Sequence, residues 1–472
     1  MCGVGQTCVA GVCTGGGTGG SPGSGGAPPT GGAPGTGGAP GTGGSAGTGA
    51  APTTGGAGPT GTCDGTFSIE TSLSDAIGTV GIVNWSLNAA MDSAYIDFGR
   101  DSAAYEYRAP VPAPSAAGNR TLLLGMKPST TYSFQIVATV NGAACASEVQ
   151  TIRTDPVRNG LPVFSVETPQ PDRLYEGFTL ACQFSGGGGG GGGGWAFILD
   201  KDGEVVWWYQ VGCGRARMSY DGQYMWMGNT NNGSTNGTLM RVLMDGTGEQ
   251  SYDFPLRHHD FTLTPDDTIA LIEYDSTSPN QACDIIQELD PASGQATTIF
   301  EVRSADSSSS GQCHTNAINW WPDRNFYTAS VLSWNSIIAF TRTGELQWVF
   351  GGNASDYSNA SWSRQHQHHL LPHSILLFNN NGSGNGSAAL ELQMNDDMSA
   401  TEIMNYSSGY SSNSLGDVKR LPNGNTLITY SNNGVMQEIT AEEQLVQQIE
   451  TDGVGYTVRR RTLYGPPPPY AE

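Results

Sequence analysis

The stretch HHDFTLTPDDTIALIEY, residues 258–274, holds two apolar runs on either side of a polar turn that contains proline. Such a pattern predicts two antiparallel strands joined by the turn. Four other stretches repeat the two apolar runs and the polar turn, and three of them have a proline in the turn. They are RMSYDGQYMWMG (217–228), HTNAINWWPDRNFYTASV (314–331), QHQHHLLPHSILLFNN (365–380) and GDVKRLPNGNTLITYS (416–431).

A second kind of hairpin alternates with these stretches. One example is WAFILDKDGEVVWWY at 195–209, where two apolar runs flank the turn DKDG. Six segments of this kind recur roughly every 45 to 54 residues, a period typical of four-stranded propeller blades. We therefore predict an all-β fold with a six-bladed β-propeller over residues 160–465. The first kind of stretch is expected to supply the inner two strands of a blade, and the second kind the outer two.

The residues before and after the predicted propeller fall into segments of different composition. Residues 14–62 are nearly all Gly, Thr, Ala, Pro and Ser, which cannot bury a core and predict a disordered tether. Residues 1–13 carry three cysteines, as a remnant of a small disulfide-bonded module would. Short alternating runs over 63–156 predict a small β-sandwich. Residues 466–472 form a proline-rich tail, and the glycine run Gly186–Gly194 has no assigned role.

The charge and hydropathy of the chain exclude some classes of function. A net charge of −22 argues against nucleic-acid binding, which needs a basic surface. No apolar run is long enough to span a bilayer, and no secretory apolar segment follows Met1.

Six of the nine cysteines are spaced as three pairs. Cys63 and Cys145 bracket the predicted sandwich, whereas the other two pairs lie at similar separations within the propeller. These are Cys182 with Cys213, and Cys283 with Cys313. Disulfides in an extracytoplasmic protein, whether periplasmic, secreted or at the cell surface, are the favoured interpretation. Reduced, buried thiols in a cytoplasmic protein are the alternative.

Polar residues stand where the inner strands are expected to reach the central channel. Counting back six to nine positions from each turn gives Arg215, His259, His314, His366 and Asp417. A propeller centre without a site would more often present small or apolar residues there. The pattern therefore favours a functional site at the mouth of the channel.

Two segments resemble known families. Trp85 and the run GMKPSTTYSFQIVAT (125–139) resemble a fibronectin type III domain, which implies a spacer or adhesive module. Over most of residues 160–460, the ordered motifs HHD, HTN, GELQWVFGG and QHQHHLLPHS ending in FNN resemble the bacterial arylsulfotransferases that use aryl sulfates as donors. This second resemblance implies a six-bladed propeller that transfers a sulfuryl group between phenols through a sulfated histidine. It implies no cofactor.

The arylsulfotransferase resemblance assigns roles to individual histidines. His366 matches the nucleophile, and His314 matches a histidine that contacts the sulfuryl oxygens or the leaving group. His258 or His259 matches the first histidine, and strand alternation favours His259. Imidazole suits this chemistry, because its unperturbed pKa near 6.5 leaves a neutral nucleophile available near neutral pH. His368, His369 and His373 are interpreted as loop or strand-surface residues.

The chain departs from the family pattern at Leu332, where active members carry an arginine. A guanidinium there would stabilise the negative charge on the sulfuryl group during its transfer. Cations from other blades are possible substitutes, and the candidates are Arg215, Arg217, Arg364 and Lys419.

Two other functions compete with transfer. In one, His259, His314, His366 and His368 bind a metal ion. In the other, the propeller is a binding or structural module with a decayed site, displayed by the tether in a homo-oligomer or surface assembly. For the transferase, the expected partners are a small aromatic sulfate donor and a phenolic acceptor.

Overall fold

The computed structural model describes residues 7–9, 12–14, 61, 63–184, 194–228, 237–277, 283–309, 311–381 and 386–466. The predicted tether, glycine run and proline-rich tail lie almost entirely outside the described residues. Residues Met1–Ala51 form a separate unit, in which β1 (Thr7–Val9) pairs antiparallel with β2 (Val12–Thr14).

The described residues are all-β, as predicted, with only short 3₁₀ turns as helix. The first described domain is a sandwich of two sheets, ordered β3-β4-β7 and β10-β8-β5-β6, with β9 also paired to β8. Both sheets contribute to its core, which includes Trp85, Phe98 and Phe134. The strands are β3 (Phe67–Leu73), β4 (Gly81–Leu87), β5 (Ser93–Gly99), β6 (Tyr107–Val111), β7 (Asn119–Leu123), β8 (Thr131–Val140), β9 (Ala143–Ala146) and β10 (Gln150–Arg153).

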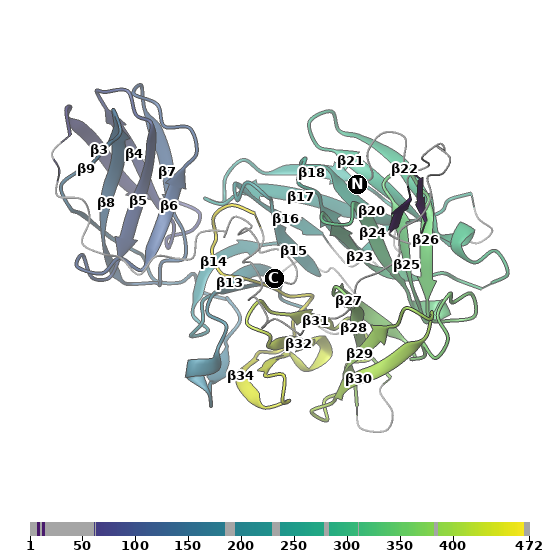
Figure 1. Ribbon diagram of the computed structural model, residues 1–472. Coiled ribbons are helices and arrows are strands. Elements are labelled where there is room, and N and C mark those ends of the chain that lie inside the picture. Colours follow the sequence, from purple (N-terminus) through teal and green to yellow (C-terminus); the bar gives the residue numbers. More distant parts are fainter. Residues whose placement is uncertain are drawn as a thin grey trace, which may run out of the picture. The chain divides into compact units, whose positions relative to one another are not determined.

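The remaining described strands form antiparallel sheets of four or five strands (Figure 1). Four sheets are each continuous in sequence, and the stretches recognised from the sequence supply their first two strands. These sheets are β15 (Arg215–Met218) to β18 (Gln250–Asp253), β19 (Arg257–Leu263) to β22 (Gln295–Glu301), β23 (Thr315–Trp321) to β26 (Leu346–Phe350), and β27 (Gln365–Leu370) to β30 (Ala400–Tyr406). Their middle strands are β16 (Tyr224–Gly228), β17 (Thr238–Leu243), β20 (Ile269–Tyr274), β21 (Asp284–Asp290), β24 (Phe326–Val331), β25 (Ser336–Thr341), β28 (Ser374–Asn379) and β29 (Ala388–Met394).

Two further sheets combine strands from both ends of this region. β35 (Val458–Arg460) pairs with β12 (Phe178–Cys182), which continues through β13 (Trp195–Leu199) to β14 (Val205–Gln210). β11 (Ser165–Glu167) pairs with β34 (Leu445–Glu450), the last strand of a sheet that runs inward through β33 (Val435–Ile439) and β32 (Thr426–Tyr430) to β31 (Asp417–Arg420). Because β35 pairs with β12 and β11 pairs with β34, strand pairing joins the first and last sheets of this region.

The first strands of successive sheets contact one another along the chain, from β15 through β19, β23 and β27 to β31. This arrangement places one edge of each of these five sheets at a shared centre. Near that edge the ladders of β19, β23 and β27 each contain a register shift. Such bulges re-aim side chains at the end of a strand. His259 and His366 lie within two of these bulges, and His314 precedes the third.

Candidate functional site

Three histidines from neighbouring sheets come together at the bulged ends of the inner strands. His259 on β19 and His314 just before β23 approach to 2.9 Å between their Nε2 atoms. The ring of His366 on β27 lies 6.1 Å from that of His259, nearly perpendicular to it. His259 and His366 are buried, whereas His314 is partly exposed. We refer to His259, His314 and His366 as the histidine cluster.

The tautomer of His366 is set by Asn380, which directly follows β28. The Asn380 amide nitrogen donates to the carbonyls of Ser412 and Leu415, which fixes its oxygen toward the imidazole. His366 Nδ1 lies 2.6 Å from that oxygen. Because an amide oxygen can only accept, Nδ1 carries the proton and Nε2 keeps a free lone pair. The arrangement leaves His366 as a neutral imidazole with an available nucleophilic nitrogen.

Burial keeps all three imidazoles uncharged at neutral pH. Desolvation lowers the pKa of His366 to about 3, although the hydrogen bond to Asn380 partly opposes this shift. Desolvation also lowers the pKa of His259 and of His314, and neighbouring histidines add to the effect. His259 and His314 have left-handed backbones, with φ of 54° and 53°. Such conformations are uncommon outside glycine and often occur at functional sites.

His258 points to a different set of groups from its neighbour His259. Its Nε2 lies 3.2 Å from Asp284 Oδ1, and its ring stacks on Tyr274 with centroids 4.0 Å apart. The second oxygen of Asp284 accepts the backbone N–H of Thr315. Asp284 therefore links β21 to the segment that carries His314. The sequence analysis did not single out Asp284, and its only signal was its place directly after Cys283.

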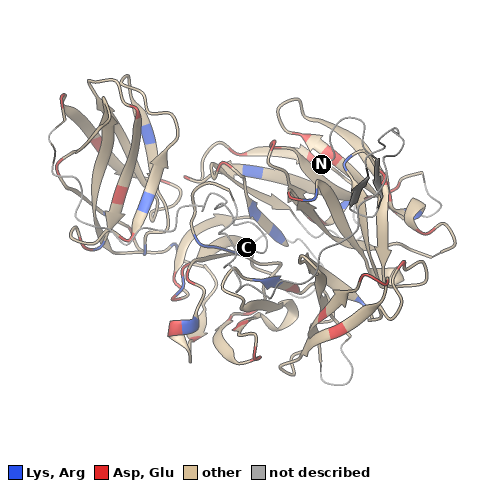
Figure 2. Ribbon diagram, viewed as in Figure 1, with Lys and Arg blue, Asp and Glu red and all other residues tan. Residues whose placement is uncertain are grey.

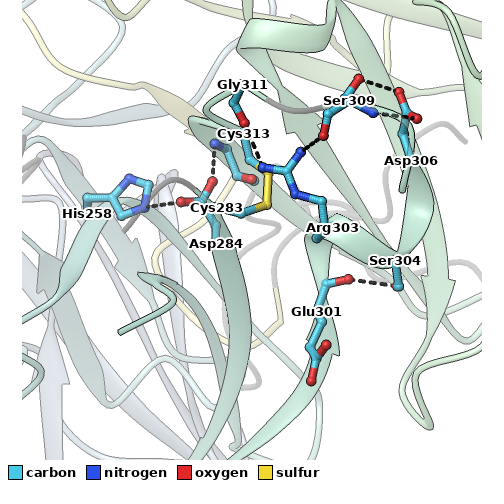
Figure 3. The surroundings of a disulfide bond; sticks show 11 residues. His258, Cys283, Asp284, Glu301, Arg303, Ser304, Asp306, Ser309, Gly311 and Cys313 are labelled. Atoms are coloured by element: carbon cyan, nitrogen blue, oxygen red, sulfur yellow. Dashed lines mark hydrogen bonds and ion pairs between the residues drawn. A yellow bond between two sulfur atoms is a disulfide. The ribbon is translucent and has the colours of Figure 1, made fainter. Parts of the chain in front are cut away.

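The disulfide Cys283–Cys313 lies next to this link (Figure 3). Cys283 precedes Asp284, and Cys313 precedes His314, so the disulfide joins the two segments that hold these side chains. Arg303 supports the same loop by donating to the backbone carbonyls of Ser309 and Gly311. The disulfide thus helps to fix the backbone beside the histidine cluster.

Arg364 is a predicted cation whose charge acts on the histidine cluster. Its side chain is exposed, and its positive charge contributes to the lowered pKa of both His314 and His366. The backbone N–H of Arg364 donates to Asn335 Oδ1 at 2.7 Å, and the backbone carbonyl of Arg364 accepts from the backbone N–H of Asn380. Asn335 follows the 3₁₀ turn Leu332–Trp334, whose first N–H donates to the His314 carbonyl.

The predicted channel residues Arg215 and Asp417 do not join the histidine cluster. Both are fully buried and paired, because Arg215 donates to Asp260 at 2.8 Å and to Asp417 at 3.2 Å. Spacing from the turn proline explains the difference for Asp417, whereas the turn after Arg215 contains no proline. Asp260 and Asp417 each stand five residues before the proline of their turn, whereas His259 stands six before it. A shift of one residue along a strand places the side chain on the opposite face of the sheet.

The buried charges on the inner strands form one group apart from the histidine cluster. We call it the charged centre, and it consists of Arg215, Arg217, Asp260, Asp417 and Lys419. Lys419 Nζ lies 3.7 Å from Asp417, and Arg217 lies 3.5 Å from Asp260. Basic positions on β15 and β31 are visible in Figure 2. Because Arg215, Arg217 and Lys419 are engaged in this centre, they do not replace the arginine expected near Leu332.

The interpretation of His368 and His369 as surface residues was wrong. Both are completely buried in β27, where neighbouring sheets cover both faces of the strand, whereas His373 is exposed in the following turn. His368 Nε2 bonds to Thr328 Oγ1 at 2.6 Å, and His369 Nδ1 accepts the N–H of Arg420. His368 is therefore not part of the histidine cluster. Within the described ranges, no group of three or more His, Cys, Asp or Glu side chains is arranged to hold a metal ion.

Acid is expected to destabilise the protein through its buried histidines. The pKa of His366 and of His368 is about 3, against 6.5 for an exposed imidazole. Below pH 6.5 the unfolded chain therefore binds protons that the folded chain does not, so the free energy of unfolding falls as pH falls toward 3. Each such histidine contributes up to about 1.4 kcal/mol per pH unit. Denaturant unfolding between pH 7 and 5 should show this slope, and His368→Gln should make it shallower. An unchanged slope would contradict the assignment.

The described cysteine pairs are oxidised as predicted. Disulfides join Cys63 to Cys145, Cys182 to Cys213, and Cys283 to Cys313. Three disulfides suggest an oxidising, extracytoplasmic environment. None of the helical turns in the described parts of the chain has the length and apolar character needed to cross a membrane.

Solved structures resemble the fold at low identity. A protein of unknown function from Bacteroides caccae is 14% identical, with a TM-score of 0.42, over 61% of this chain and all of that chain. Virginiamycin B lyase from Staphylococcus aureus is 14% identical, with a TM-score of 0.38, over 60% of this chain and 88% of that chain. A periplasmic gluconolactonase from Pseudomonas aeruginosa is 11% identical, with a TM-score of 0.39, over 60% of this chain and 98% of that chain.

No curated protein sequence matches the chain. A family model does match residues 281–452. This segment carries His314, Arg364, His366 and Asn380, whereas His259 lies just ahead of it. The model is that of arylsulfotransferase (ASST), so residues 281–452 of this chain are similar to the arylsulfotransferase family.

Proposed function

We propose that this protein transfers a sulfuryl group from a phenolic sulfate ester to a phenol, with His366 as the residue that becomes sulfated. The observation that carries the proposal is the hydrogen bond from His366 Nδ1 to Asn380, which leaves Nε2 unprotonated within the histidine cluster. A neutral, buried imidazole is a competent nucleophile, because no water shell must be removed from a charge before attack.

The first half-reaction forms a bond between His366 Nε2 and the donor sulfur while the bond from sulfur to the phenolic oxygen breaks. The leaving phenolate takes a proton from His314, the partly exposed member of the cluster. The anionic donor favours the protonated form of His314 at this stage. In the second half, the acceptor phenol gives its proton to His314, its oxygen attacks sulfur, and the bond from sulfur to Nε2 breaks. His259 Nε2, at 2.9 Å from His314, orients that imidazole.

Arg364 supplies the cation that the family carries near Leu332. It stands eight residues before the turn proline Pro372, as His314 stands eight before Pro322. Its backbone contacts Asn335, at the end of the turn that begins at Leu332, and Asn380, the partner of His366. The exposed guanidinium can therefore approach a sulfuryl group on His366 and stabilise the negative charge on its oxygens.

The proposal also covers the architecture, the location and the partners of the protein. The six sheets close as a six-bladed propeller, with β35 completing the first blade and β11 extending the last. The preceding sandwich acts as a fibronectin type III-like spacer, in a protein that works in the periplasm, at the cell surface or outside the cell. Small phenolic sulfates and phenols are its partners.

The proposal is tested by the release of fluorescent phenol from 4-methylumbelliferyl sulfate with and without added phenol. Release that depends on the acceptor supports transfer. A protein that releases no phenol from several aryl sulfates, yet still binds them, would instead be a binding module, and the proposal would fail.

Loss of the disulfide beside the cluster is expected to reduce transfer. In the double variant Cys283→Ala/Cys313→Ala, the segments that carry Asp284 and His314 lose their covalent link. The transfer rate should fall several-fold, and unfolding should cost about 2–4 kcal/mol less. Cys63→Ala/Cys145→Ala, in the sandwich, is the matched control. Equal transfer rates in both double variants would contradict the positioning role.

A further inference from the structure

Two backbone carbonyls decide which end of the Asn380 amide faces His366. The amide donates one N–H to the carbonyl of Ser412 at 2.6 Å and the other to the carbonyl of Leu415 at 2.8 Å. Rotation of the amide by 180° would fill the same space but would set its oxygen against both carbonyls. It would also turn an N–H group toward Nδ1 of His366. That imidazole would then carry its proton on Nε2 and lose the lone pair that attacks sulfur.

The chain that supplies these carbonyls has an unusual backbone just before β31. Leu415 is buried and has a left-handed conformation, with φ of 55°. Such a conformation is rare for a bulky residue, and it costs free energy that surrounding contacts must offset. Gly416 follows it, where a β-carbon would collide with the ring of Phe378 on β28. The N–H of Gly416 donates to Ser431 Oγ at 2.9 Å.

Asn432 supplies several of the contacts that hold this backbone. It lies in the 3₁₀ turn Ser431–Asn433, between β32 and β33, in the sheet next to that of His366. Its Oδ1 accepts the backbone N–H of Ser414 at 2.9 Å and the hydroxyl of Ser412 at 3.1 Å. Its own backbone N–H donates to Ser412 Oγ at 3.1 Å. Ser387 assists, because its hydroxyl accepts the N–H of Ser412 at 2.9 Å.

We propose that the segment Ser412–Leu415, held by Asn432, is a positioning element that keeps His366 in its nucleophilic tautomer. Asn432 holds Ser412, and the carbonyl of Ser412 holds the amide of Asn380. Asn380 in turn directs the imidazole of His366. Asn432 therefore acts on the nucleophile through Asn380. The effect on the reaction rate rests on the proposed transfer, whereas the effect on the tautomer does not.

The tautomer of His366 can be measured from the shifts of its ring nitrogens by NMR, in protein that carries isotope-labelled histidine. The spectrum of His366→Ala identifies the signals. In the unmodified protein the proton should reside on Nδ1. In Asn432→Ala the segment loses an acceptor, so the Asn380 amide can rotate and a population protonated on Nε2 should appear. Asn432→Asp keeps an acceptor oxygen and should restore the proton on Nδ1.

The transfer rate should follow the tautomer. Asn432→Ala is expected to lower kcat about tenfold or more, because only molecules with a free Nε2 lone pair can attack sulfur. KM should stay within about twofold, since binding of the donor does not need that lone pair. Asn433→Ala is the matched control, because Asn433 is the next residue of the same turn and is likewise exposed. It should change neither the tautomer nor the rate.

An unchanged tautomer in Asn432→Ala, the same change in Asn433→Ala, or a changed tautomer with an unchanged rate of transfer would overturn the proposal. Unfolding midpoints close to that of the unmodified protein ensure that folded proteins are compared. The ring shifts are recorded without substrate, so they separate this proposal from the transfer itself. A protein that moves no sulfuryl group, yet whose His366 tautomer depends on Asn432, would contradict the proposed function and support the positioning element.

Discussion

His366→Ala is expected to abolish phenol release that depends on an acceptor, lowering kcat/KM by about 10³-fold or more. The alanine has no nitrogen to attack sulfur, so the covalent route is lost and not merely slowed. Asn380 would lose one contact but would keep those to Ser412 and Leu415, and the surrounding turn should remain folded. Initial rates with 4-methylumbelliferyl sulfate and phenol provide the measurement.

His373→Ala is the control for this variant. His373 lies in the same hairpin but is exposed in its turn, outside the histidine cluster. Its replacement should leave the rate within about twofold of the unmodified protein, as is usual for exposed positions. Retained transfer in His366→Ala, or an equal loss in His373→Ala, would contradict the assignment of the nucleophile.

Arg364→Gln is expected to lower kcat by about 10²–10³-fold, the usual effect of removing one group that stabilises charge in a transition state. The binding of the donor should weaken less, because the charge on the sulfuryl oxygens increases most as the bond to the leaving group breaks. Arg461→Gln is the control at another exposed arginine, and it should be unaffected.

A rescue variant makes this second prediction sharper. Adding Leu332→Arg to Arg364→Gln places a guanidinium where the family normally carries one, on the turn that contacts the His314 carbonyl. Part of the lost rate should return. If Arg364→Gln is fully active, or if the double variant is no better than the single one in a folded protein, then Arg364 does not supply the missing charge.

Much of the architecture was predictable because the chain repeats one local pattern. Alternating apolar runs around turns such as TPDD and LPNG indicated the order of strands, and the cysteine spacing indicated three disulfides that are present. These features depend on local sequence, so they need no knowledge of which sheets meet.

The site was harder to predict because it depends on bulges and on pairing between sheets. Arg215 and His259 were aligned as equivalent, yet a shift of one residue buries the first in ion pairs and places the second beside His314. His368 and His369 were taken for surface residues, since one sequence does not show that both faces of β27 are covered. Asn380 belonged to a recognised FNN motif, but its contact with His366 appears only once β27 and β28 are paired.

The sulfated intermediate is the most direct test of the proposed function. The protein is mixed with aryl sulfate in the absence of acceptor, quenched under alkaline conditions, and digested for mass analysis of the peptide that contains His366. We expect the mass of one sulfuryl group on His366, no such group in His366→Ala, and its loss when phenol is added before the quench. Donor turnover without any sulfated histidine, or with the group on another residue, would contradict the account.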